Sequence, residues 1–145
     1  MSFRDHTFLL DHVGSLMAFY HPQAVDRRLG GYFQNYRDDG TIFDPGFRHL
    51  VSSTRMVFNY AMAAMHLAGG DPPQPDRDEY LEAARHGLVY LEQAHWQPGL
   101  EGYAWTLRDN EPEETTHQNY GLAFVVLAGA TALRTSSSVQ VGGPA

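Results

Sequence analysis

The sequence predicts an all-α protein built from helical hairpins, and three observations carry that prediction. Apolar residues recur at helical spacing in four segments of the 145-residue chain. A Gly-Tyr pair followed by Arg-Asp occurs at residues 31–38 and again, 71 residues later, at residues 102–109. Segments rich in charge alternate with segments nearly free of it. Together these features are typical of stacked helical repeats, and they favour a toroid with a central pocket.

The four helices are expected at residues 4–20, 47–68, 76–95 and 115–134, because Gly, Pro and Asp clusters bound each apolar segment. Between Val51 and Ala68 the second carries only Arg55 as a charge, and the fourth carries none between Tyr120 and Leu133. A helix that is apolar nearly all round must be covered on more than one side. The first and third helices are therefore predicted to be outer, and the second and fourth inner.

The two aromatic stretches, residues 31–38 and 102–109, lie between an outer and an inner helix and suit short strands or a β-hairpin. Two hairpins do not close a ring, and residues 135–145 are rich in Ser, Gly and Pro. We therefore expect the repeat to occupy residues 1–134 and to be interrupted there, with 135–145 as a disordered or aberrant tail.

Composition narrows the class of function. A net charge of −7 removes the main electrostatic attraction for nucleic acids and anionic membranes, so neither is an expected partner. The chain has no Cys, no run of signal-peptide character and no apolar run of about 18 residues, which predicts a cytoplasmic protein. A phosphate-binding Gly-rich loop and a nucleophile elbow are both lacking, and no cofactor is expected.

The inner helix at residues 47–68 carries the first candidate binding residues. Ser52, Arg55 and Asn59 recur at three- and four-residue spacing and form a polar stripe. A buried guanidinium needs a partner, so either Arg55 pairs with an acid such as Asp38, Asp39 or Asp44, or it faces a wet pocket. We favour the pocket, where Arg55 donates to oxygen and stays charged.

The aromatic stretches supply further candidates in Tyr103 and Trp105. Rings with a polar edge suit the hydrophobic face and the hydroxyl rim of a sugar, although composition alone favours packing within the hairpin for most of these side chains. No His pair has metal-binding spacing with a neighbouring acid, so no metal is expected. His117, at the start of the fourth helix, is the one His considered as an acid or base. The acid pairs at residues 38–39 and 113–114 fall in predicted turns.

Two blocks of sequence resemble the N-acylglucosamine 2-epimerase superfamily. The first is Gly-Gly-Tyr-Phe-Gln-Asn-Tyr-Arg-Asp-Asp-Gly-Thr-Ile-Phe-Asp at residues 30–44, followed by Ser-Thr-Arg-Met-Val-Phe-Asn-Tyr-Ala-Met-Ala at 53–63. The second is Glu-Gly-Tyr-Ala-Trp-Thr-Leu at 101–107, with Tyr-Gly-Leu-Ala-Phe at 120–124. The branch of bacterial mannose and sulfoquinovose isomerases looks particularly similar.

The resemblance implies an (α/α)6 barrel, of which this chain would supply about two of six hairpins as its N-terminal part. It implies metal-independent isomerisation of mannose–fructose type, or 2-epimerisation, of a monosaccharide through an enediol. Arg55 then matches a substrate-binding Arg and Tyr103 a pocket Tyr. The family's catalytic His residues belong to later hairpins, and Leu122 stands where many relatives carry His. No catalytic residue is therefore predicted, and the chain is expected to be inactive alone.

Two other hypotheses remain open. The chain could be a non-catalytic helical-repeat module that associates with itself or a partner through uncovered inner helices, because uncovered apolar surface drives association. A toroidal glycosidase is less favoured, because hydrolysis needs two acids across one pocket and the acids available lie in turns.

Overall fold

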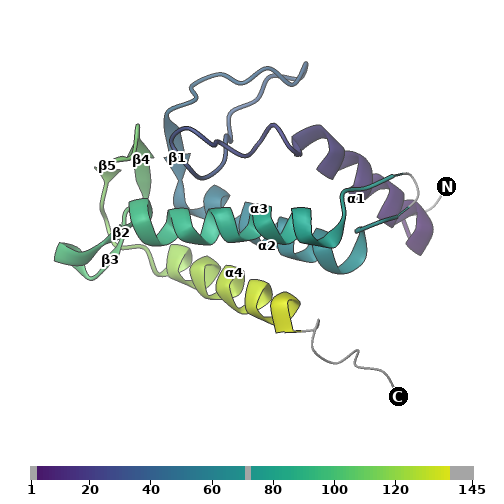
Figure 1. The fold of residues 1–145 in the computed structure, drawn as a ribbon. Helices are drawn as coiled ribbons and strands as arrows, with labels where there is room; N and C mark the ends of the chain where they lie inside the picture. Colours follow the sequence, from purple (N-terminus) through teal and green to yellow (C-terminus); the bar gives the residue numbers. More distant parts are fainter. Residues whose placement is uncertain (1–2, 71–72, 138–145) are drawn as a thin grey trace.

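A computed structural model describes residues 3–70 and 73–137 (Figure 1). Its four α-helices confirm the predicted helical class. They are α1 (His6–Tyr20), α2 (Leu50–His66), α3 (Arg77–Tyr90) and α4 (Asn119–Ser137). The strands are β1 (Phe47–His49), β2 (Trp96–Gln97), β3 (Gly102–Tyr103), β4 (Thr106–Arg108) and β5 (Glu111–Glu114). Two short turns, π-helical η1 (Leu91–His95) and 3-10 helical η2 (Pro98–Leu100), follow α3. Within the described residues, no helix is long and apolar enough to cross a membrane.

Helix α2 is the centre of the molecule. It packs against both α3 and α4, and the hydrophobic core is built where the three meet. Val57 and Ala61 of α2, Tyr80 of α3 and Ala128 of α4 have no exposed surface. Helix α1 lies to one side, near the end of α2 (Figure 1), and buries only Gly14 and Met17. The second predicted helix is thus covered on more than one side, as its composition required.

The 71-residue repeat is present in the hydrogen bonds as well as in the sequence. Asp5 and Asp76 cap α1 and α3, each accepting a backbone N–H three residues on. The Phe33 N–H donates to the Ala24 carbonyl at 2.8 Å, and 71 residues later the N–H of residue 104 donates to the carbonyl of residue 95 at 2.7 Å. The bridge of residues 25 and 32 likewise recurs at residues 96 and 103. The predicted duplication is therefore a duplication of backbone geometry.

The two repeats are joined by a three-stranded antiparallel sheet of order β1-β4-β5. Residues 47–49, predicted as the first turn of a helix, are instead strand β1, and Phe47 pairs with Arg108. The helix prediction was wrong there because the backbone of residues 47–49 forms β-sheet hydrogen bonds with a strand far along the chain. The local spacing of apolar residues does not reveal such a partner. His49 then caps α2, its ring Nδ1 accepting the Val51 N–H at 3.1 Å.

Other helix boundaries also differ from the prediction, and α4 begins at Asn119 where residue 115 was expected. The helix expected at 76–95 is α3 continued by the π-helical turn η1. The helix expected to end at 134 continues to Ser137, because Thr135 is buried against α2 and its hydroxyl donates to the Thr131 carbonyl at 2.8 Å. The rest of the predicted tail, residues 138–145, lies outside the described residues, so the domain boundary stays a prediction.

Gly87 allows α3 to approach Tyr32 closely. The Tyr32 hydroxyl donates to the Ala83 carbonyl at 2.6 Å, and a Cβ on Gly87 would collide with the Tyr32 ring and hydroxyl. We expect Gly87→Ala to lower the free energy of unfolding by about 1–3 kcal/mol, although alanine is the better helix former. Gly129→Ala in α4 is the matched control, because nothing lies within 4 Å of its added Cβ. There we expect stabilisation of about 0.5–1 kcal/mol in urea unfolding. Equal effects at both positions would contradict the prediction.

Candidate functional site

Arg55 lies on the exposed side of α2, next to α4. Its guanidinium carbon stands 4.9 Å from the centre of the Phe124 ring, a cation–π contact between the two predicted inner helices. Arg55 and Asn59 line a hollow of about 370 Å³ whose other wall is Phe124 and Leu127 of α4. The structure therefore brings two of the four predicted site residues together in one hollow.

The guanidinium of Arg55 has no ion-pair partner among the described residues. Of the acids considered as partners, Asp44 binds Arg108 at 2.8 Å, and Asp39 accepts from the Thr41 hydroxyl at 2.7 Å. Arg55 is itself exposed. Of the two possibilities for Arg55, the geometry fits a charge that faces an open hollow. Its five N–H donors are therefore available to a ligand rich in oxygen.

Tyr103 lies in a different place. It belongs to strand β3, packs edge-to-face on Trp96 at 5.1 Å between ring centres, and lines a separate hollow of about 270 Å³ with Trp96 and Glu92. In this structure the hollow that holds Arg55 is not lined by Tyr103. The role of Tyr103 as a sugar contact stays a prediction.

Trp105 packs at the beginning of the inner helices. Its ring meets the His49 ring at 4.5 Å between centres, and a Cβ on Gly121 would collide with it. The Leu50 N–H donates to the Trp105 carbonyl at 2.9 Å, which fixes the start of α2 to the second aromatic stretch. Trp105 is therefore engaged in packing that orients α2, and its predicted role as a sugar contact is untested.

All eight His residues lie in the described part of the chain, and none of them lines the hollow of Arg55. His117, considered from the sequence, is exposed and lies beside Gly102. His49 uses Nδ1 to cap α2, and burial lowers its pKa although the charge of Glu114 opposes this. His95 is completely buried, and burial lowers its pKa to about 4. His95 therefore stays neutral at pH 7 and lies outside the hollow of Arg55.

His95 instead connects three segments of the core. The Ala104 carbonyl can only accept, so its 2.9 Å contact places the ring proton on Nδ1. The Ser53 hydroxyl then donates to Nε2 at 3.1 Å. No local pattern in the sequence signals this link, because its three residues come from α2, η1 and an aromatic stretch.

The acids considered for a glycosidase are all exposed at the surface. Asp38, Asp39, Glu113 and Glu114 each have exposed side chains, and Glu113 pairs with Arg108 at 3.2 Å. Within the part of the chain that the structure describes, no group of three or more His, Asp or Glu is arranged to hold a metal ion. The hollow of Arg55 is lined by no carboxylate.

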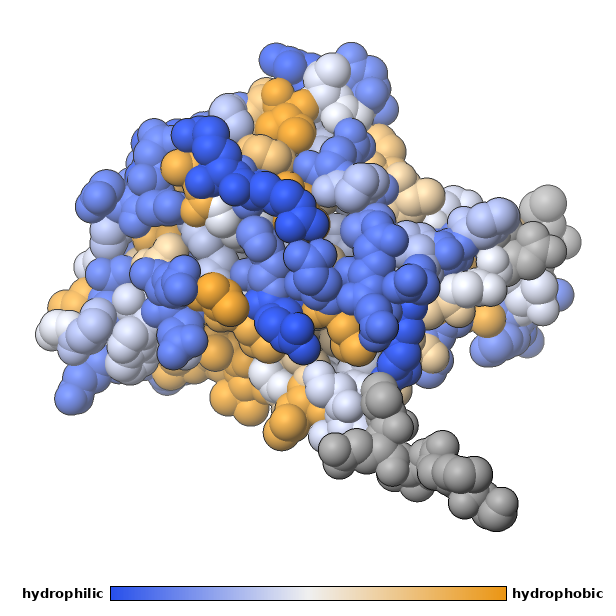
Figure 2. All heavy atoms as spheres, in the orientation of Figure 1, coloured by the Kyte–Doolittle hydropathy of each residue, from blue (hydrophilic) through white to orange (hydrophobic). Residues whose placement is uncertain are grey.

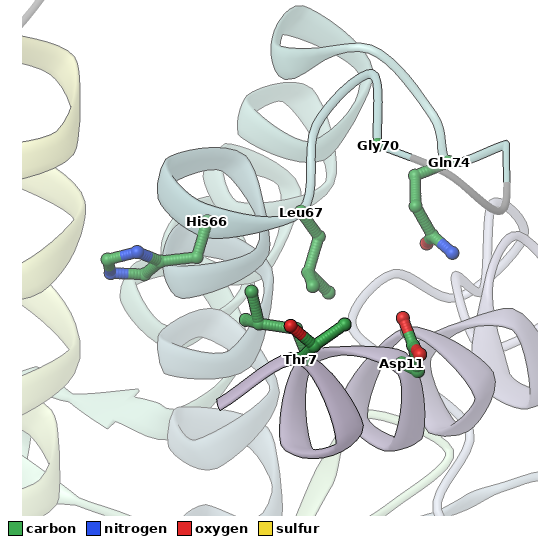
Figure 3. A pocket seen from close by; sticks show the side chains of 8 residues that line it. Thr7, Asp11, His66, Leu67, Gly70 and Gln74 are labelled. Atoms are coloured by element: carbon green, nitrogen blue, oxygen red, sulfur yellow. The ribbon is translucent and has the colours of Figure 1, made fainter. Parts of the chain in front are cut away.

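A further hollow, of about 210 Å³, opens at the other end of α2. Figure 3 shows Thr7 and Asp11 of α1 on one side and His66 and Leu67 on the other, with Gln74 above. The Gln74 side-chain oxygen accepts from the Tyr80 hydroxyl at 2.8 Å. None of the four predicted site residues lines this hollow.

Comparison with known proteins identifies a family and similar folds. The family model of N-acylglucosamine 2-epimerase (GlcNAc 2-epimerase) matches residues 31–140. D-mannose isomerase of Marinomonas mediterranea is 44% identical over 137 residues, which are 94% of this chain and 32% of that protein. The chain thus spans about a third of the length of this relative.

Solved structures agree with this. A crystal structure of D-mannose isomerase is similar with a TM-score of 0.82 at 43% identity, over 95% of this chain and 33% of that one. Cellobiose 2-epimerase from Bacillus thermoamylovorans B4167 has a TM-score of 0.74 at 17% identity, over 92% of this chain and 34% of its own, and shows likeness of fold.

Proposed function

This chain belongs to the N-acylglucosamine 2-epimerase family, and we propose that it forms two hairpins of an (α/α)6 barrel that binds and isomerises a monosaccharide. The observation that carries the proposal is the unpaired Arg55 guanidinium, stacked on Phe124 in a hollow between two inner helices. The identity to D-mannose isomerase supports mannose or its ketose as the substrate.

The hollow has the chemistry that a sugar requires. The guanidinium of Arg55 and the amide of Asn59 donate to hydroxyl and carbonyl oxygens. The exposed part of the Phe124 ring, beside Leu127, offers an apolar surface to the C–H face of the sugar. Hydrogen-bond donors and an apolar wall thus lie side by side in this hollow, as they do in sites that orient small polar ligands.

In the proposed reaction a base removes the proton from C2 of the open-chain aldose, the electron pair forms a double bond between C1 and C2, and the former carbonyl oxygen O1 takes up a proton to give the enediol. Return of a proton to C1, with loss of the O2 proton, gives the ketose. Arg55 stabilises the negative charge that develops on oxygen and exchanges no proton itself. The base must have a pKa near the working pH.

Neither His95 nor His49 is placed to act as that base. His95 is buried and His49 is occupied in capping α2, and neither lines the hollow of Arg55. We therefore propose that residues 1–145 bind sugar but do not turn it over, and that proton transfer depends on further hairpins. Purified residues 1–145 are expected to give no interconversion of mannose and fructose in a ketose assay. Turnover that copurifies with the chain and is lost in Arg55→Met would contradict this.

Binding is tested separately from turnover. Titration of the chain with mannose, followed by NMR of the guanidinium and amide protons, is expected to shift the side-chain resonances of Arg55 and Asn59. Arg55→Met is expected to weaken binding about 10-fold or more, because a hydrogen bond to a charged group contributes about 1.5–3 kcal/mol. Arg85→Met is the matched control, since Arg85 is an exposed Arg of α3 outside this hollow. Equal loss in both variants would argue against a sugar site at Arg55.

A second function, a helical-repeat interaction module, is favoured by one observation. Helix α4 exposes large apolar side chains, among them Val126 at 71% and Leu133 at 69%. Such surface drives association.

A further inference from the structure

Trp105 packs against the starts of both inner helices, α2 and α4. Its ring meets the ring of His49, the residue that caps α2, at 4.5 Å between centres. It also meets Gly121 in the first turn of α4, where an added Cβ would stand 2.9 Å from the Trp105 ring and 2.7 Å from the Leu50 side chain. Gly121 and Leu50 are both buried. The two helices thus approach each other as closely as a glycine allows.

Hydrogen bonds hold Trp105 in this place. Its N–H donates to the Glu114 carbonyl at 2.7 Å, and its carbonyl accepts the Leu50 N–H at 2.9 Å. The preceding residue, Ala104, is bonded twice to His95. The N–H of Ala104 donates to the His95 carbonyl at 2.7 Å, and its carbonyl accepts from the His95 ring at 2.9 Å. The backbone that carries the Trp105 ring is therefore fixed on both sides.

An atom added to Gly121 would displace α4. Carbon atoms in contact stand about 3.5–4.0 Å apart, so distances of 2.7 and 2.9 Å require a movement of roughly 1 Å. Helix α2 is held between α3 and α4. Helix α4 lies along the lower edge of the molecule in Figure 1, where Figure 2 shows hydrophobic surface. The start of α4 is thus the part that moves away from α2.

The contact between Arg55 and Phe124 lies just beyond this point. Phe124 follows Gly121 by three residues, which is about 4.5 Å along α4. Arg55 follows Leu50 by five residues, which is about 7.5 Å along α2. The guanidinium carbon stands 4.9 Å from the centre of the Phe124 ring, and a cation–π contact requires a separation within about 6 Å. A movement at Gly121 therefore reaches this contact.

We propose that Trp105 and Gly121 are positioning residues of the sugar site, which set the spacing of α2 and α4 and so hold Phe124 against the Arg55 guanidinium. Neither residue lines the hollow of Arg55, so both act on a ligand through that pair. The proposal rests on the proposed function, because it assigns the contact of Arg55 and Phe124 to sugar binding. It gives Trp105 a role in binding that requires no contact with the sugar.

Gly121→Ala tests the spacing in the absence of sugar. The Phe124 ring shifts the NMR resonances of side-chain protons held over its face, so Arg55 reports directly on the contact. We expect Gly121→Ala to move the Arg55 side-chain resonances toward those of Phe124→Leu, in which the ring is absent. Gly129→Ala is the matched control on the same helix, because nothing lies within 4 Å of its added Cβ, and it is expected to leave these resonances in place. Unchanged Arg55 resonances in Gly121→Ala would overturn the proposal.

Titration with mannose tests the consequence for binding. Gly121→Ala is expected to weaken binding about 3- to 10-fold, since the contact partner of Arg55 is displaced while Arg55 itself is retained. Gly129→Ala is expected to bind like the parent chain. Moved resonances with unchanged binding would overturn the proposal, because the spacing would then not serve the sugar. A parent chain that binds no mannose contradicts the proposed function instead, and the Arg55 resonances still decide whether Gly121 sets the contact.

Trp105→Phe provides a second test that adds no atom to α4. Its smaller ring is expected to move the Arg55 resonances as well, so it decides the proposal even where Gly121→Ala is too unstable to measure. Combined with Gly121→Ala, it makes room for the added Cβ, and the double variant is expected to recover part of the binding that Gly121→Ala loses. Circular dichroism checks that each variant keeps the helical fold. Arg55 resonances that stay in place in Trp105→Phe, or a double variant that binds more weakly than Gly121→Ala, would overturn the proposal.

Discussion

Replacing Arg48 with methionine is expected to lower the free energy of unfolding by about 3–5 kcal/mol, a large part of the stability of an ordinary domain. Arg48 and Asp26 form an ion pair at 2.6 Å, and their side chains are only 1% and 2% exposed. The second guanidinium nitrogen of Arg48 donates to the carbonyls of Pro45 and Phe47 at 2.6 and 3.0 Å. Without Arg48, the carboxylate of Asp26 is left buried beside two free carbonyls.

Urea unfolding measures this effect, and three further variants help to interpret it. Asp26→Asn keeps an oxygen for the backbone N–H groups of residues 28 and 29 that Asp26 now caps. The double variant is expected to be more stable than the sum of the two single losses by about 0.5–3 kcal/mol, since it removes both charges together. Arg108→Met breaks two exposed ion pairs and is expected to cost less than about 1 kcal/mol. A similarly small effect at Arg48 would contradict the prediction.

Acid is expected to destabilise the fold through His95 by about 2 kcal/mol between pH 7 and pH 5. Burial lowers the pKa of His95 to about 4 in the folded chain, below its unfolded value of about 6.5. Between those two values the unfolded chain binds more protons, so the contribution is complete above about pH 6.5 and is lost as the pH falls toward 4. Burial lowers the pKa of His49 too, so His49 also contributes to the loss of stability in acid.

Urea unfolding across this pH range, compared between parent and His95→Gln, isolates the effect. Glutamine has no proton to gain, so its stability curve is expected to be flatter below pH 6.5, whatever the loss at pH 7. His117→Gln controls for the removal of an exposed His and is expected to leave the pH dependence unchanged. If His95→Gln keeps the full slope, another group is responsible.

The helical plan of this chain could be predicted because it is encoded locally. The spacing of apolar residues located α1 to α4. The repeated Gly-Tyr motif located two stretches that make equivalent backbone hydrogen bonds, one from Phe33 and the other from Ala104. Arg55 stands out in the sequence because the rest of its helix carries almost no charge. These features depend on near neighbours in sequence or on composition.

The links that hold the segments together could not be predicted, because their partners are distant in sequence. The apolar spacing places Arg48 within a helix, whereas it is the buried partner of Asp26. His95 is one of eight His residues with no distinguishing spacing, and only the fold shows that it joins Ser53 to Ala104. Likewise, Tyr32 and Tyr103 occupy equivalent positions of the repeated motif, but Tyr32 is buried under α3 while Tyr103 lines an open hollow.

The pairing of β1 with β4 has a consequence for how the chain folds while it is being synthesised. Strand β1 leaves the ribosome well before β4, yet Phe47 and His49 pair with Arg108 and Thr106. We therefore expect the first repeat to remain incompletely folded, with no partner strand to hold the start of α2, until the second aromatic stretch has been translated. A pause between the two repeats would present an unpaired strand and an apolar helix to chaperones and proteases, so the rate of elongation through α3 sets how long the nascent chain is vulnerable.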